Sequence, residues 1–150
     1  MDRGRLRALT AGAVVLASGL ALGPVPAAAA GPVGGDSREA KAWGCTVRAV
    51  VSWNRNTNRY TYRGFGSCAK TRKMRIWCFP VHRHWNGVSA TWHSHTGYEI
   101  RQGPNVTRRV DTGASTIGGG NENTYKINCK LELDGVFWLR IKVETGPFHL

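Results

Sequence analysis

The sequence predicts an all-β fold built as an antiparallel β-sandwich. Several short segments alternate apolar and polar residues with a period of two, which is typical of strands with one buried face. Residues that favour turns separate these segments, and residues 31–150 contain no convincing helical pattern. The same residues contain all four cysteines, which fits a two-disulfide framework. Short strands joined by turns in a domain of this length favour a sandwich of the immunoglobulin-like type.

The N-terminal segment predicts export. A short basic segment, residues 1–7, precedes a mostly apolar stretch over 8–22, and the small residues Ala28 and Ala30 fit the A-x-A cleavage rule. The apolar stretch has about 15 residues, whereas a membrane-spanning helix needs roughly 20. We therefore expect a cleaved Sec-type signal peptide over 1–30 rather than an uncleaved anchor. The mature protein is then secreted and has no transmembrane anchor.

The mature chain begins with a segment that predicts little structure. Residues 31–43 are rich in glycine and charge, so we expect a flexible lead-in before a single disulfide-bonded domain over 44–150.

Residues 45–53 and 60–68 predict the first hairpin, because both alternate apolar and polar residues. Placing Trp53 opposite Tyr60 keeps the two apolar sets on one side of the sheet. The same register places Cys45 opposite Cys68, at a separation that a disulfide tolerates. Of the three connectivities that four cysteines allow, we therefore favour Cys45–Cys68 and Cys78–Cys129.

A second hairpin is expected at residues 74–96. The segment 74–85 is rich in aromatic residues, although Pro80 indicates a bulge or an edge position. Asn86-Gly87 is a strong two-residue turn signal, and it would pair Trp85 with Val88. The following residues, 97–121, are the least regular part of the sequence, with short strands expected at 98–100 and 106–110.

The last hairpin joins strands at 125–133 and 137–143. A three-residue loop over 133–135 keeps both apolar faces on the same side and pairs Leu131 with Phe137.

Two short motifs carry a resemblance. Residues 66–68 follow Cys45 as Gly-Ser-Cys, and residues 125–129 read Tyr-Lys-Ile-Asn-Cys. With these motifs the chain resembles small secreted actinobacterial proteins that have a disulfide-bonded β domain of unassigned function. The resemblance covers most of residues 45–133. It implies an exported β domain and assigns no functional residue.

Histidines form the first candidate site. Two H-x-H pairs, His82 with His84 and His93 with His95, flank the Asn86-Gly87 turn. Residues two apart on a strand point the same way, so His82 would lie opposite Thr91 with His93 as its diagonal neighbour. The imidazoles of His82, His84 and His93 could then hold Zn²⁺ or Cu²⁺. The alternative is a set of solvated or hydrogen-bonded histidines.

Aromatic and basic residues form the second candidate site. Because Cys78 faces the core to meet Cys129, its neighbours along the strand face outward. Aromatic rings interleaved with arginines suit stacking on sugars, or contact with bases and phosphates. The alternative is that a second sheet or residues 97–121 cover this face. The candidate binding residues are Trp77, Phe79, Trp85, Trp92, Arg75 and Arg83.

Charge favours acidic partners. The formal net charge is +12, and the loss of three arginines and one aspartate with residues 1–30 leaves +10. Short basic clusters at 70–73 and 108–109 come without the signature of a nucleic-acid-binding fold, although nucleic acid stays open as a partner. The sequence contains no G-x-S-x-G, H-E-x-x-H or phosphate-binding loop motif.

The favoured interpretation is a secreted, non-enzymatic binding protein that acts at an anionic or glycan-bearing cell surface or wall. Its partner would be an anionic wall polymer, a glycan or the cell surface itself. One alternative is a metal-binding protein or small metalloenzyme that uses His82, His84 and His93. Another is a secreted protein inhibitor. No cofactor other than Zn²⁺ or Cu²⁺ is expected.

Overall fold

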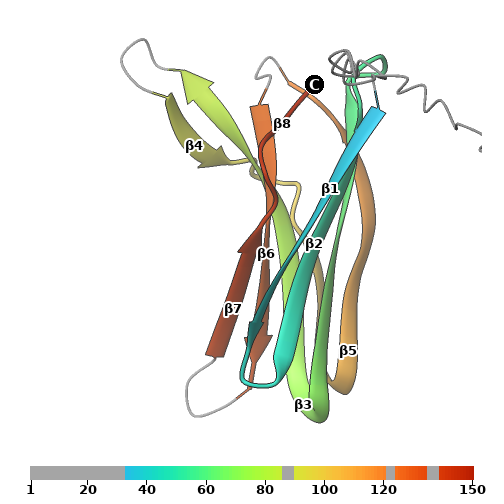
Figure 1. Cartoon of the computed structure of the whole chain (residues 1–150), viewed down its shortest axis with the longest axis vertical. Coiled ribbons are helices and arrows are strands. Elements are labelled where there is room, and N and C mark those ends of the chain that lie inside the picture. Colours follow the sequence, from blue (N-terminus) through green and yellow to red (C-terminus); the bar gives the residue numbers. More distant parts are fainter. Residues whose placement is uncertain (1–32, 86–89, 121–123, 135–138) are drawn as a thin grey trace, which may run out of the picture.

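The computed structural model describes residues 33–85, 90–120, 124–134 and 139–150, and these form antiparallel strands (Figure 1). The all-β, sandwich-like prediction is confirmed. The predicted signal peptide and the Asn86-Gly87 turn lie outside the described residues. The strands are β1 (Val33–Ala42), β2 (Cys45–Asn54), β3 (Arg59–Trp85), β4 (Ala90–Ser94), β5 (Ile100–Gly118), β6 (Thr124–Leu133), β7 (Leu139–Glu144) and β8 (Phe148–His149).

The long strand β3 shapes the molecule, because it bends and contributes to two layers (Figure 1). Residues 59–68 of β3 pair with β2, and residues 74–82 pair with β6. Strand β5 follows the other edge of β3 through the bend. One continuous sheet therefore folds over itself, whereas an immunoglobulin sandwich has two separate sheets. We call the β1–β2 side the first layer and the β6–β7 side the second layer.

The hairpin of β2 and β3 confirms the predicted register. Trp53 pairs with Tyr60 and Cys45 pairs with Cys68. Both predicted disulfides form, Cys45–Cys68 within this hairpin and Cys78–Cys129 between β3 and β6. The alternating apolar residues of both layers point inward and form one core.

The predicted flexible lead-in is wrong for residues 33–42, which form β1 and pair with β2 along their whole length. A two-residue turn joins the strands, with Trp43 and Gly44 both at positive φ, 51° and 71°. Such turns usually contain Asn-Gly or Asp-Gly, so Trp-Gly gives only a weak signal. Strand β1 is also largely solvent-exposed and polar, and its sequence therefore lacks apolar alternation.

Two predicted registers are wrong by even numbers of residues. Trp85 pairs with Ala90 instead of Val88, and Leu131 pairs with Ile141 instead of Phe137. The connections are thus longer than the predicted two-residue and three-residue loops. Because side chains alternate with a period of two, an even shift leaves every residue on its predicted face.

Asp36 connects β1 with the segment after β7 through a hydrogen bond. Its carboxylate accepts a hydrogen bond from the Gly146 amide at 2.6 Å and one from Arg38 Nε at 3.2 Å. Partial burial of the Asp36 carboxyl raises its pKa, but these hydrogen bonds and the Arg38 charge outweigh burial and leave the pKa below its ordinary value. This contribution to stability is present above the unfolded-state pKa and disappears as the pH falls through the lowered folded-state pKa.

We expect Asp36→Ala to destabilise the pairing of β1 by about 1.5–3 kcal/mol, the usual value of a hydrogen bond to a charged group. Amide hydrogen exchange should accelerate in β1 while β6 stays protected. Glu39→Ala removes an exposed carboxylate from the same strand and serves as the control. Equal exchange in both variants would contradict this role for Asp36.

Candidate functional site

The outer face of the second layer is formed by residues that alternate with the disulfide-bonded cysteines. Trp77 pairs with Lys130 and Phe79 with Asn128, on either side of the Cys78–Cys129 pair. Since paired residues point to the same side of a sheet, these four side chains project away from the core. We call this surface the outer face of β3 and β6.

Cations lie against the aromatic rings of this face. Lys130 Nζ is 4.8 Å from the centre of the Phe79 ring and 5.8 Å from that of Trp77. The guanidinium carbon of Arg75 is 5.3 Å from the Trp77 ring centre. Such contacts are attractive and place a positive charge above the ring surface. Phe79 is only 8% exposed. The rings therefore support cations rather than presenting bare surfaces for stacking.

A buried carboxylate fixes two of the arginines. The side chain of Glu132 is fully buried, and it pairs with Arg75 Nε at 2.5 Å and Arg140 Nε at 2.6 Å. A buried charge requires such pairing, so Glu132 holds both guanidinium groups on this face. By contrast, Lys130 and Lys142 make no ion pair within the part of the chain that the structure describes. They supply the uncompensated charge of the face.

The predicted binding residues divide into two groups. Arg75, Trp77 and Phe79 lie together on the outer face of β3 and β6. Arg83 and Trp92 pair with each other further along the same side, where β3 meets β4. Trp92 is 39% exposed, and Lys126 Nζ lies 4.7 Å from its ring centre.

The side chain of the remaining predicted residue, Trp85, lies outside the described residues. The sequence reasoning did not assign the cations contributed by β6 and β7. The alternation of residues 124–133 and 139–144 predicts that these cations point outward. It does not predict how far they lie from the aromatic rings on the neighbouring strand. These cations are Lys126, Lys130, Arg140 and Lys142.

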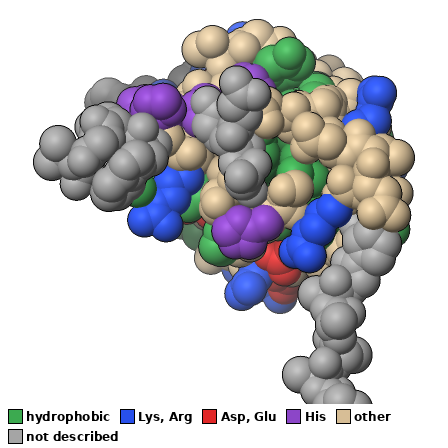
Figure 2. Space-filling model, turned by 90° about the horizontal axis from the view of Figure 1, so that it is seen from above, with side chains coloured by type: hydrophobic (Ala, Val, Ile, Leu, Met, Phe, Trp, Pro, Cys, Tyr) green, Lys and Arg blue, Asp and Glu red, His purple; other side chains and the backbone are tan. Residues whose placement is uncertain are grey.

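The histidines gather on the inward side of β3 and β4, at one end of the sandwich. His82 pairs directly with His93, not with Thr91 as predicted, because the connection between the strands is longer than a two-residue turn. The ring centres of His82 and His93 are 6.2 Å apart, and those of His84 and His93 are 5.9 Å apart. His95, which the sequence reasoning did not assign, lies 5.3 Å from His82. Figure 2 looks onto this end and shows histidine side chains around uncovered hydrophobic ones.

His93 has a polar partner on its own strand. The His93 Nε2 atom lies 2.7 Å from the Thr91 hydroxyl. Within the described ranges, no three His, Cys, Asp or Glu side chains are placed to hold a metal ion. A Zn²⁺ or Cu²⁺ site at His82, His84 and His93 stays a prediction.

The fold and the outer face define a disulfide-bonded β-sandwich with a basic, aromatic surface. No family model matches the chain, and no curated protein matches its sequence. Among the described residues there is no helix long and apolar enough to cross a membrane.

Proposed function

We propose that this chain is a secreted, non-enzymatic binding protein for an acidic polymer at a cell surface or wall. The observation that supports the proposal is the excess of cations over carboxylates on the outer face of β3 and β6. The carboxylates there are paired: Glu132 with Arg75 and Arg140, Glu144 with Lys126, and Glu99 with Arg101. The cations on this side of β3, β5, β6 and β7 are Arg75, Arg83, Arg101, Lys126, Lys130, Arg140 and Lys142.

Cation placement favours an anionic ligand over a neutral glycan. A neutral sugar ring stacks on an open aromatic surface, whereas here Lys130 and Arg75 lie against the rings of Phe79 and Trp77. The hollow beside Trp77 and Arg101 measures only about 110 Å³. Pockets for small ligands usually measure about 300–1,000 Å³. An extended polymer lying across a flat, charged surface suits these dimensions better.

Secretion is supported by the two disulfides and by the predicted signal peptide. Structural disulfides persist in oxidising compartments such as the extracellular space. An extracellular location and a positively charged surface both favour a polyanion outside the cell as the partner.

The test compares two variants that each remove two positive charges. Lys130→Gln/Lys142→Gln changes the outer face of β3 and β6, and the control Lys70→Gln/Arg108→Gln changes exposed positions at the bend of β3 and β5. We expect the first variant to bind dextran sulfate roughly tenfold more weakly, equivalent to about 1.4 kcal/mol. The control should bind nearly as well as the unchanged chain. Fluorescence anisotropy with labelled polymer measures both.

Salt and neutral polymer complete the test. Binding should weaken as ionic strength rises, because exposed charges are screened. Neutral dextran should not bind. Equal affinity of the two variants, or equal binding of neutral and sulfated dextran, would contradict the proposed face.

A further inference from the structure

A groove of about 470 Å³ lies on the opposite side of the molecule, on the outer face of the first layer. It crosses β1, β2, β3 and β5, and Phe65 occupies its middle. The lining residues include Glu39, Arg48, Phe65, Ser67, Arg109 and Asp111.

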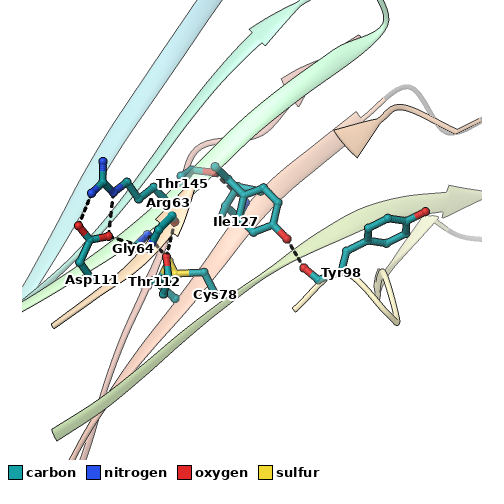
Figure 3. The surroundings of a disulfide bond; sticks show 11 residues. Arg63, Gly64, Cys78, Tyr98, Asp111, Thr112, Ile127 and Thr145 are labelled. Atoms are coloured by element: carbon teal, nitrogen blue, oxygen red, sulfur yellow. Dashed lines mark hydrogen bonds and ion pairs between the residues drawn. A yellow bond between two sulfur atoms is a disulfide. The ribbon is translucent and has the colours of Figure 1, made fainter. Parts of the chain in front are cut away.

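Both carboxylates in the groove are already paired. Glu39 pairs with Lys41 at 2.8 Å. Asp111 accepts two hydrogen bonds from Arg63, shown in Figure 3, and the Arg63 guanidinium holds the pKa of the Asp111 carboxyl below its ordinary value. The charges of Glu39 and Asp111 are therefore compensated by cations.

Two further arginines of the groove make no ion pair among the described residues. Arg48 stands directly opposite Phe65 in the pairing of β2 with β3. Arg109 stands opposite Ser67 in the pairing of β3 with β5, which places it diagonally beyond Phe65. Arg48 and Arg109 therefore stand on the two strands that lie to either side of Phe65.

The local contacts position one of these arginines. Arg48 Nε donates to Ser37 Oγ at 2.7 Å, which leaves its terminal nitrogens for another partner. Arg63, whose charge is paired with Asp111, lies over the Phe65 ring at 4.7 Å. A planar guanidinium matches the geometry of carboxylate and phosphate oxygens, with two parallel hydrogen bonds.

We infer that the groove is a second anion-binding site, which takes carboxylate or phosphate groups through Arg48 and Arg109. This inference rests on the proposed function and extends it. The two sites lie on opposite outer faces of the sandwich, so one molecule contacts two polymer strands at once. The chain then acts as a cross-linker of acidic polymers.

The experiment maps the two sites separately by nuclear magnetic resonance of the isotopically labelled, disulfide-bonded chain. Tripolyphosphate and triglutamate are the probes, since they are too short to reach both faces and they distinguish phosphate from carboxylate. We expect amide shifts at residues 46–48, 65–67 and 109–111, and a second set at residues 126–130 and 140–142. If only one of the two probes produces both sets of shifts, the anionic group of that probe, phosphate or carboxylate, is the preferred ligand.

Two variants of the groove test the assignment. Arg48→Gln/Arg109→Gln should remove the first set of shifts and leave the second. Arg48→Lys/Arg109→Lys keeps the positive charges but loses the planar guanidinium groups. The affinity measured from the first set of shifts should therefore fall several-fold, and the shifts should remain detectable. Unchanged spectra at β6 show that each variant is folded.

Long polyphosphate tests the cross-linking. Light scattering should rise and then fall as protein is added to polymer, and Arg48→Gln/Arg109→Gln should suppress the rise without preventing binding. Shifts at β6 and β7 alone, or groove shifts that persist in the glutamine variant, would overturn the second site and leave the proposed function intact. Absence of polymer binding by the unchanged chain would overturn both.

Discussion

Gly64→Ala is expected to prevent the native fold or the formation of the Cys78–Cys129 disulfide. Gly64 lies on the inner side of β3, next to Cys78 in Figure 3. A Cβ atom added there would overlap Cys78 Sγ, and it would lie 3.1 Å from Cys129 Sγ and 3.3 Å from Ile76 Cδ1. Overpacking a core usually costs about 1–3 kcal/mol. We expect at least about 3 kcal/mol here, since the disulfide restricts how far the two sulfur atoms can move away.

Denaturant unfolding and free-thiol titration measure the effect. The matched control is Gly118→Ala in β5, where the nearest atom to the added Cβ is 3.9 Å away and the substitution should be tolerated. A Gly64→Ala protein with no free thiol and with the stability of the control would contradict the close packing of the two halves of β3.

Strands that are buried on one side were predictable. In β2 and in the first half of β3, a strict alternation of apolar residues and a short turn admit one register, and that register determined both disulfides. Strands β1 and β5 each have a single hydrogen-bonded neighbour, and most of their side chains are exposed. Such edge strands need no apolar alternation, so β1 was predicted as a flexible lead-in and β5 as a mostly irregular segment with short strands at 98–100 and 106–110.

The sequence predicts which side of the sheet each residue of the candidate site faces, because this depends only on the alternation of residues along a strand. The position of Cys78 implied that Trp77 and Phe79 point outward, and they do. Lateral neighbours depend instead on register, and the register depends on the number of residues in each connection. The direct pairing of His82 with His93 was missed for this reason.

Removal of the Cys78–Cys129 disulfide is expected to cost more stability than removal of Cys45–Cys68. The two bridges close loops with sequence separations of 51 and 23 residues. In the chain-entropy model these loops correspond to about 4.1 and about 3.4 kcal/mol at 25 °C. Cys78 and Cys129 are also both fully buried, whereas Cys68 is partly exposed. The loss of their two sulfur atoms would leave a cavity under Gly64, which adds to the difference.

The comparison uses Cys78→Ala/Cys129→Ala and Cys45→Ala/Cys68→Ala, each with the other disulfide intact. We expect the first melting temperature to be lower than the second by about 5 °C or more, given roughly 3–6 °C per kcal/mol for a domain of this size. Scanning calorimetry measures both transitions. Equal melting temperatures would show that neither loop length nor burial distinguishes the bridges.

The same pair of variants connects stability with binding. Trp77 and Lys130 form the strand pair next to Cys78 and Cys129, so this disulfide maintains the distance between an aromatic ring and its cation. Below both melting temperatures, Cys78→Ala/Cys129→Ala should therefore bind dextran sulfate more weakly, and Cys45→Ala/Cys68→Ala should bind it as the unchanged chain does. Unaltered binding in both variants would mean that the hydrogen bonds between β3 and β6 alone position Lys130 against Trp77.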